Sequence, residues 1–168
     1  MGGRMTNARR KGKNGELEAA EVLSNVFPFK WRRSAQRCGK AQADIEPVEY
    51  DLPLHVEVKR YAGGLAYWTK RVERDPRGLF IAEPKYDFDQ PLLFCDVRHI
   101  RYHVNQESLP QPGVRNASAL VWMKQAVRDA EDGFVPVVLC REDHGPWILA
   151  WRYHDDNPLM AMLAKVWK

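Results

Sequence analysis

The sequence predicts an α/β fold in which helices flank a central mixed β-sheet. Helical and strand patterns follow in the order helix, three strands, a less regular insertion, helix, two strands and helix. A continuous apolar run from Phe134 to Cys140 has the length of a strand and predicts burial on both faces of the sheet. With 168 residues, 45% of them hydrophobic and 29% charged, the chain is long enough for one domain with a substantial core.

The N-terminal region predicts a basic arm followed by a helix. Residues 1–13 are interpreted as a flexible arm, and residues 14–168 as a single domain. A helix is expected from about Gly15 to Val26, with Asn14 as its N-cap. Its apolar stripe at helical spacing consists of Ala19, Val22, Leu23 and Val26.

Three strands are expected next, separated by turns that contain glycine or proline. They run from Phe29 to Gln36, around Ala43 to Tyr50, and from Leu54 to Arg60. Side chains on a strand alternate between its faces. Glu57 and Lys59 therefore share one face of the third strand, and the apolar residues between and before them share the other.

An insertion is expected after the third strand, over residues 61–116. It is interpreted as either a subdomain or a long decorated loop with some strand content. Its short apolar runs are Gly78 to Ala82 and Pro91 to Val104, and the second run alternates like a strand. The chain is then expected to continue with a helix from Ala117 to Glu131 ended by Gly133, strands from Phe134 to Cys140 and from Trp147 to Trp151, and a helix from Asn157 to Trp167.

The charge is unevenly distributed. Residues 1–40 carry ten Lys or Arg and three Glu. Residues 41–168 carry sixteen Lys or Arg and nineteen Asp or Glu. A basic arm on a near-neutral body favours a polyanionic partner, although a solvated tail would have the same composition. No apolar run approaches the length of a membrane span, the N-terminus lacks a secretory pattern, and three cysteines form no disulfide framework. A reducing cytoplasm is the expected location.

Two carboxylates and a lysine form the candidate catalytic set. Asp44 lies thirteen residues before the Glu-x-Lys of Glu57 and Lys59. Carboxylates suit a hard cation such as magnesium, and a lysine can orient or activate a water, which together favour phosphodiester hydrolysis. A second Glu-x-Lys, Glu83-Pro84-Lys85, is disfavoured because Pro84 has no N–H for a central strand.

Glu16 is a candidate third acidic residue. A helical projection places it within the apolar stripe of the first helix, where a glutamate is costly unless it is paired or binds a cation. The alternative is that Glu16 simply lies in the first helical turn, where the helix dipole favours an acidic side chain.

The motifs Lys11-Gly12-x-x-Gly15-Glu16, Arg33-Ser34, Asp44 and His55-Val-Glu57-Val-Lys59 together resemble the archaeal-type Holliday junction resolvases and related phage endonucleases of the PD-(D/E)xK, restriction-endonuclease-like superfamily. The resemblance covers residues 10–60 and resumes between Trp122 and Trp147. Ala43 stands where a proline is usual, and residues 61–116 have no counterpart.

The resemblance implies a restriction-endonuclease-like core and a role for each matched residue. Asp44, Glu57 and the Val58 carbonyl would hold magnesium or manganese, Lys59 would position or activate the attacking water, and Glu16 would hold a second metal or its water shell. Arg33 and Ser34 would contact the scissile strand. The full set of expected DNA-binding residues is Arg9, Arg10, Lys11, Lys13, Arg32, Arg33, Ser34 and Arg60.

Other residues have weaker patterns. Gln125 occupies the place of a glutamine often found on the helix after the Glu-x-Lys strand, but a helical projection turns it away from the apolar face. His55 shares the face of Glu57 and is a candidate neighbour of the site.

Trp31 could stack on a base, although core packing is the simpler interpretation. A zinc site is disfavoured because no CxxC accompanies Cys95, His99 and His103.

The resulting hypothesis is a magnesium-dependent DNA endonuclease that acts as a homodimer on branched DNA, such as a Holliday junction. Its expected location is the cytoplasm, which would be that of the host cell if a phage encodes the protein. The alternatives are a non-catalytic DNA-binding or protein-interaction module on the same fold, and a nicking, end-processing or sequence-specific nuclease.

Overall fold

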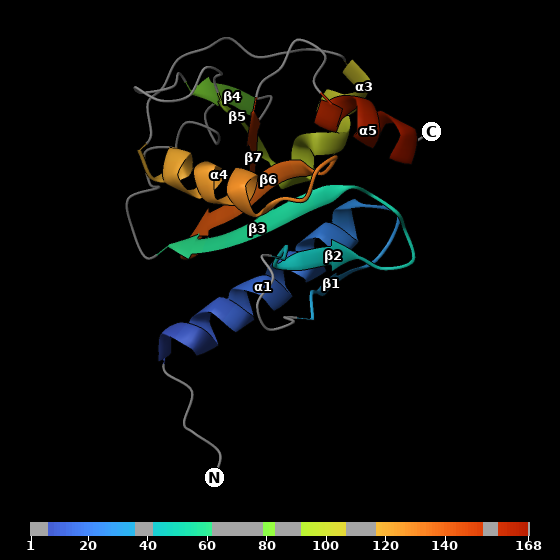
Figure 1. Cartoon of the computed structure of the whole chain (residues 1–168). Coiled ribbons are helices and arrows are strands. Elements are labelled where there is room, and N and C mark those ends of the chain that lie inside the picture. Colours follow the sequence, from blue (N-terminus) through green and yellow to red (C-terminus); the bar gives the residue numbers. More distant parts are fainter. Residues whose placement is uncertain are drawn as a thin grey trace.

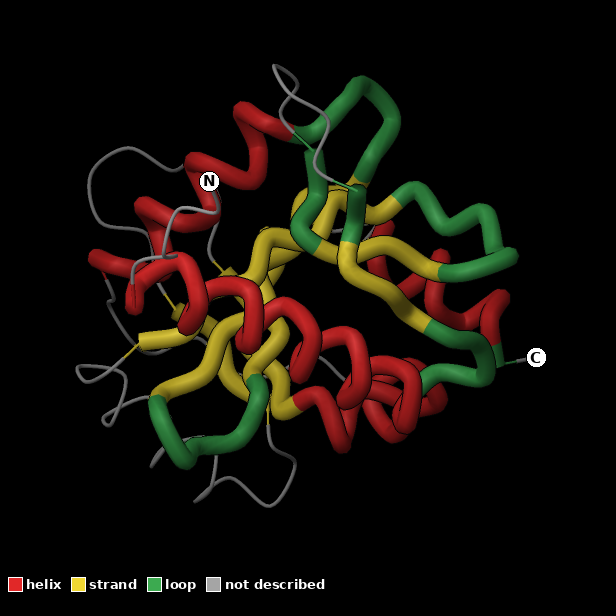
Figure 2. The backbone as a smooth tube through the Cα atoms, turned by 90° about the horizontal axis from the view of Figure 1, so that it is seen from below, coloured by secondary structure: helices red, strands yellow, loops and turns green. Residues whose placement is uncertain are grey.

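A seven-stranded mixed β-sheet, counted over the described part of the chain, organises the molecule (Figure 1). The computed structural model describes residues 7–35, 42–61, 79–82, 92–106, 117–152 and 158–167. Figure 2 shows the strands running through the middle of the molecule with helices around them. In spatial order they are β1 (Trp31–Arg33), β2 (Ile45–Pro47), β3 (Leu54–Tyr61), β6 (Val135–Glu142), β7 (Ile148–Arg152), β5 (Leu92–Asp96) and β4 (Leu79–Ala82).

The centre of the sheet is the parallel pair β3 and β6. Their register runs from Leu54 opposite Val135 to Tyr61 opposite Glu142, so all eight residues of β3 are paired. The other neighbouring strands pair in the antiparallel sense. The strand that carries Glu57 and Lys59 is therefore an interior strand, which fixes the direction of both side chains.

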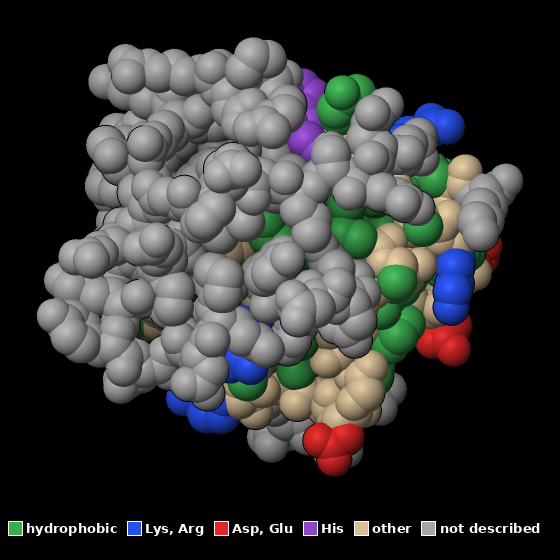
Figure 3. Space-filling model, turned by 90° about the horizontal axis from the view of Figure 1, so that it is seen from above, with side chains coloured by type: hydrophobic (Ala, Val, Ile, Leu, Met, Phe, Trp, Pro, Cys, Tyr) green, Lys and Arg blue, Asp and Glu red, His purple; other side chains and the backbone are tan. Residues whose placement is uncertain are grey.

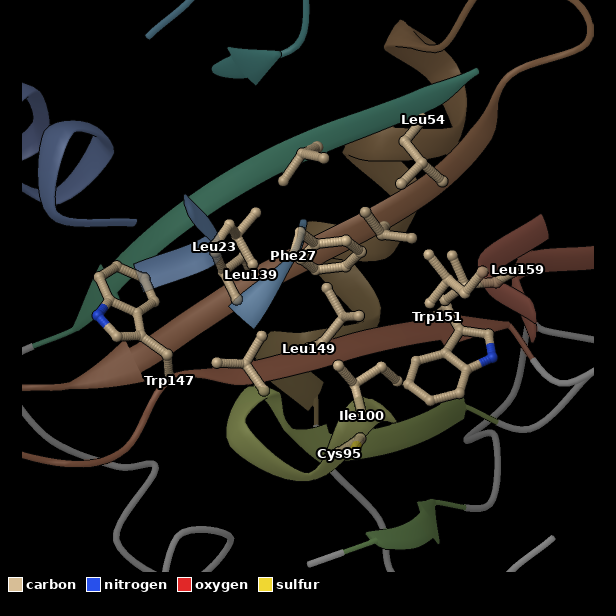
Figure 4. Packing of buried hydrophobic residues seen from close by; sticks show 14 of the residues in the cluster. Leu23, Phe27, Leu54, Cys95, Ile100, Leu139, Trp147, Leu149, Trp151 and Leu159 are labelled. Atoms are coloured by element: carbon tan, nitrogen blue, oxygen red, sulfur yellow. The ribbon is translucent and has the colours of Figure 1, made fainter. Parts of the chain in front are cut away.

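One face of the sheet is covered by α1 (Asn7–Val26), α3 (Ile100–Gln106) and α5 (Pro158–Val166). A short 3-10 helix, η1 (Val97–His99), leads into α3. Each fully buried aliphatic or aromatic side chain in this core stabilises the fold by about 1.5–3 kcal/mol relative to exposure. Figure 4 shows part of this packing, with labelled side chains that include Leu23, Phe27, Leu54, Ile100, Leu139, Leu149, Trp151 and Leu159.

The opposite face is covered by α4 (Ala117–Asp129), from which Met123 and Ala126 are fully buried. They pack in a second core with Val138 and Cys140 of β6. Strand β6 thus contributes to both cores, as the continuous apolar run predicts. Among the described residues, no helix has both the length and the apolar character needed to cross a membrane.

Among the residues that the structure describes, two free cysteines lie in different cores. Cys95 of β5 belongs to the core under α1, α3 and α5, whereas Cys140 of β6 belongs to the core under α4. Burial raises the pKa of the Cys95 thiol far above its usual range, with a further contribution from Asp96. Burial alone raises the pKa of Cys140 to about 12. Both thiols are therefore protonated, inert parts of the packing.

Several predicted boundaries are wrong. Helix α1 begins at Asn7 rather than near Gly15, so Asn14 lies inside it and residues 7–13 are its first turns. Strands β1 and β2 are each three residues long, shorter than expected. The expected strand up to Val104 ends at Asp96 and is followed by helix. Its buried residues Val97, Ile100 and Val104 recur at helical spacing, which explains the difference.

The described parts of the insertion belong to the main sheet. Strand β5 pairs with β7 from Leu92 opposite Arg152 to Asp96 opposite Ile148, and β4 pairs with β5. The expected strand content is therefore present, but these strands extend the central sheet rather than form a layer of their own. The competing Glu83-Pro84-Lys85 motif lies outside the described residues.

Candidate active site

Glu57, Lys59 and Gln125 form a closed set of hydrogen bonds between β3 and α4. Lys59 Nζ donates to Glu57 Oε1, and Gln125 Nε2 donates to the same oxygen at 2.6 Å. Lys59 Nζ also donates to Gln125 Oε1 at 3.1 Å. Glu57 is only 4% exposed, so these two donors offset the unfavourable burial of its charge.

Gln125 thus contacts the catalytic candidates, contrary to the helical projection that turned it away from the sheet. It lies beside the buried residues Met123 and Ala126 at the border of the face that α4 packs on β6. From this border its long side chain reaches across to β3. The projection identified the apolar side of the helix but not the reach of a polar residue beside it.

Asp44 is held next to this set by the pairing of β2 with β3. Its backbone N–H donates to the carbonyl of Val56 at 2.8 Å, which extends the ladder beyond Ile45. Its Oδ2 accepts from the backbone N–H of Val58 at 2.7 Å. The carboxyl of Asp44 is therefore anchored to the strand residue between Glu57 and Lys59.

The carboxyl of Asp44 resists ionisation. Its pKa is raised from 3.8 to about 7, chiefly by burial and then by the negative charge of Glu57. Glu16 raises the pKa further, while the Val58 N–H and Lys59 lower it without compensating. Acidic side chains from α1 and β3 thus both disfavour the charge on Asp44, which directly precedes β2, and a cation placed beside Asp44 would relieve this repulsion.

Glu16 faces the sheet, as the projection of the first helix predicts. Its carboxylate accepts a hydrogen bond from Arg33 of β1, and its side chain is 14% exposed. The glutamate is therefore paired with an arginine in this structure, and it also contributes to the electrostatics of Asp44. The same pairing holds Arg33, one of the expected DNA-binding residues, close to the candidate site.

The donor chemistry fits a hard divalent cation held by few protein ligands. No group of three or more His, Cys, Asp or Glu is gathered at metal-binding distance among the described residues, so Glu16 does not complete a three-carboxylate cage. Asp44 and Glu57 remain as neighbouring oxygen donors. Magnesium is commonly bound by one or two carboxylates, keeping several of its waters, and this set suits such a site.

His55 is buried on the same face as Glu57, and its Nε2 lies 4.0 Å from Glu57 Oε2. Burial lowers its pKa, against the opposing influence of Glu57, Asp129 and Glu131. The imidazole is therefore neutral at neutral pH. Ser34 is also buried, at 5% exposure, and its backbone N–H donates to the carbonyl of Asp44 at 3.0 Å.

Several expected DNA-binding residues are engaged in ion pairs. Arg60 contacts Glu18 at 3.4 Å and Asp143 at 3.0 Å, and Lys11 contacts Asp143 at 2.8 Å. Arg141 also donates to Glu18. This network joins α1 to the ends of β3 and β6, and no sequence pattern indicated it.

Gly15 of α1 lies against Arg60 of β3. A Cβ at this position would lie 3.5 Å from Arg60, which is an ordinary van der Waals distance, so the approach of the helix to β3 does not depend on a glycine here.

Three other basic candidates, Arg10, Lys13 and Arg32, face the solvent. Arg32 pairs with Glu46 at 2.8 Å, while Arg10 and Lys13 are exposed on the first turns of α1. The side chain of Arg9 is outside the described set. On the face drawn in Figure 3, the described basic and acidic side chains are interspersed and form no single basic patch.

Two further sequence hypotheses concern residues away from the site. Cys95, His99 and His103 form no metal-binding group among the described residues: Cys95 is on a buried strand and His99 is exposed. Trp31 is 6% exposed and packs edge-on against Phe27 at 5.5 Å, so it contributes to the core.

Replacing Gln125 with alanine is expected to reduce turnover about 10- to 100-fold in any reaction that depends on Lys59. The change removes one donor from Glu57 and one acceptor from Lys59. A hydrogen bond to a charged group contributes about 1.5–3 kcal/mol, so losing the equivalent of one such bond in the transition state corresponds to the expected change in rate. Steady-state kinetics should show a lower kcat with KM nearly unchanged, as expected for a positioning residue. Val121→Ala, on the exposed side of the same helix, is the matched control.

Comparisons with protein-family models, curated proteins and solved structures found no match for this chain.

Proposed function

We propose that this chain is a magnesium-dependent DNA endonuclease with a restriction-endonuclease-like core. The observation that carries the proposal is the arrangement of Glu57 and Lys59, fastened by Gln125, with the electrostatically strained Asp44 anchored on the adjoining strand. The mixed sheet flanked by helices is compatible with such a core. The motif resemblance supports the specific chemistry.

In the proposed site, Asp44 and Glu57 would hold the cation, with the Val58 carbonyl as a further oxygen donor. A bound magnesium or manganese ion supplies charge stabilisation at the phosphate and lowers the pKa of a water ligand. Lys59 would orient the attacking water through its ammonium group, whose direction is fixed by Glu57 and Gln125. Glu16 would act on a second cation or its waters when released from Arg33.

The substrate class proposed first is branched DNA, including four-way junctions, cut by a homodimer. This follows from the resemblance rather than from a feature of the fold. A nicking, end-processing or sequence-specific nuclease would use the same chemistry. A non-catalytic module is disfavoured because Glu57, Lys59 and Gln125 are hydrogen-bonded to one another and Asp44 is anchored to Val58, between Glu57 and Lys59.

A substrate panel tests the proposal directly. Purified protein with magnesium would be offered a four-way junction, a flap, a nicked duplex, a linear duplex and a single strand. Magnesium-dependent cleavage of at least one substrate, absent with a chelator, is the expected result. Tight binding to DNA without cleavage of any member, with magnesium or manganese, would instead support the non-catalytic module.

Neutralising the first turns of α1 is expected to weaken DNA binding and its salt dependence. The double substitution Arg10→Gln with Lys13→Gln removes two exposed positive charges. The slope of log K against log salt concentration is negative, and each lost phosphate contact reduces its magnitude by about 0.9 on duplex DNA. The magnitude should therefore decrease by up to about 2. Binding titrations at several salt concentrations measure it. Lys165→Gln, an exposed lysine on α5, should leave the slope unchanged.

A further inference from the structure

A pocket of about 190 Å³ opens beside the candidate active site, between β1, β2, the start of β3 and the turn that follows α4. The candidate metal ligands Asp44 and Glu57 are not among its lining residues, but each has a neighbour that is. Ala43, which lines it, directly precedes Asp44, and His55, which also lines it, has its Nε2 4.0 Å from Glu57 Oε2. Along a strand, two residues span about 7 Å, a separation comparable to the reach of one nucleotide.

Two side chains of the pocket lining carry polar atoms that the fold leaves unsatisfied. Ser34 Oγ and His55 Nε2 are both buried, and neither has a hydrogen-bond partner among the described residues. A buried polar group without a partner destabilises a protein, and its presence in a pocket lining is informative. Both atoms have almost no accessible surface, so each side chain would have to turn toward the pocket before a donor or acceptor in a bound molecule could satisfy it.

The chemistry of the lining selects the kind of ligand. None of the described residues that line the pocket is Lys or Arg, whereas Glu46 and Glu131 are among them, so a phosphate would be repelled. Phe134 lies at the rim with 41% of its surface exposed, offering an aromatic face for stacking. The volume suits a flat ring system better than a whole nucleotide or a drug-sized ligand.

We infer that this pocket receives an unpaired nucleobase of the substrate, from a nucleotide next to the scissile phosphate. The base would stack on Phe134 and hydrogen-bond to Ser34 and His55, while its phosphate remains outside, toward Asp44 and Glu57. A base bearing an exocyclic amino group would donate to Glu131. This inference rests on the proposed nuclease function and specifies its substrate: DNA in which a base at the cut is free to leave the helix.

The test combines one protein change with one DNA change. On the substrate that is cut best, each nucleotide flanking the cut is replaced in turn by an abasic residue. At one position, cleavage by the wild-type protein should fall about tenfold, since base stacking on an aromatic residue contributes about 1–3 kcal/mol. Phe134→Ala should slow cleavage of the intact substrate similarly. The combined loss should be no larger than either alone.

Additive losses, or full-rate cleavage at both abasic positions, would overturn the nucleobase pocket while leaving the nuclease intact. Tyr102→Ala, at an exposed aromatic on α3, is the matched control and should cut both substrates at the wild-type rate.

A binding measurement separates failure of the pocket from failure of the proposed function. The affinity of Lys59→Ala protein for a single-stranded oligonucleotide is compared with that for its fully abasic counterpart. A preference of about tenfold for the base-bearing strand, abolished by Phe134→Ala, supports the pocket even if no substrate is cleaved. Equal affinity for both strands rejects the pocket, whatever the outcome of the cleavage panel.

Discussion

Replacing Lys59 with alanine is expected to reduce magnesium-dependent DNA cleavage roughly a thousandfold, within the range typical of a lost acid–base group. Lys59 Nζ is the cationic donor to the buried Glu57, and Gln125 fixes its direction. Without the amine, the water that attacks phosphorus loses its orienting group. Single-turnover cleavage kinetics at saturating protein measure the effect independently of affinity.

The fold and the DNA affinity should largely survive this change. Gln125 remains as a donor to Glu57, so the buried carboxylate keeps one hydrogen bond. The circular dichroism spectrum should therefore match that of the wild type. The DNA affinity from a binding titration should differ by no more than a few-fold. The second Glu-x-Lys of the sequence supplies a matched control, since Lys85→Ala should cut normally. Cleavage by Lys59→Ala within tenfold of wild type would contradict the proposed role.

Replacing Asp44 with asparagine is expected to stabilise the metal-free protein at pH 8 while abolishing cleavage. The folded pKa of about 7 lies above the ordinary value of 3.8, so folding favours the protonated carboxyl. The stabilisation from this proton is complete below pH 3.8 and is lost as the pH rises through 7. Above pH 7, ionised Asp44 thus destabilises the fold by at most about 4 kcal/mol.

Asparagine cannot ionise, and it can still accept from the Val58 N–H. Denaturant unfolding with a chelator present should show Asp44→Asn to be the more stable protein at pH 8, with a smaller difference at pH 5. Added magnesium should then raise the stability of the wild type but not of the variant. Asp51→Asn, at an exposed carboxylate, should change neither. Lower stability of Asp44→Asn at pH 8 would show that the carboxylate is well accommodated.

The sheet and its two faces could be predicted from the sequence because hydrophobic alternation is a local signal. Leu54 and Val56 lie in one core while Glu57 and Lys59 face α4, as their alternation predicts. Strand β6 supplies residues to both cores, as its continuous apolar run predicts. The motif resemblance predicted that Asp44 lies close to Glu57. The physical cause is the pairing of β2 with β3, which the hydrogen bond from the Asp44 N–H to the Val56 carbonyl extends.

The features that the sequence did not reveal depend on contacts distant along the chain. Helix α1 extends back to Asn7 through a segment with no apolar stripe, and its first turns are held by the pair between Lys11 and Asp143. Neither the length of this helix nor the partner of Lys11 has a local signature. Gln125 likewise could not be assigned from helix periodicity, because its role depends on reach across to β3.

Chemical labelling of the two buried thiols can report when the helical layers separate from the sheet. Cys95 and Cys140 lie in different cores, on opposite faces of the same sheet. An alkylating reagent can reach either sulfur only when the layer above it lifts. Comparing the rates at which the two sites are labelled, by peptide mass mapping, would therefore tell whether the helical layers separate from the sheet in one cooperative event or one at a time.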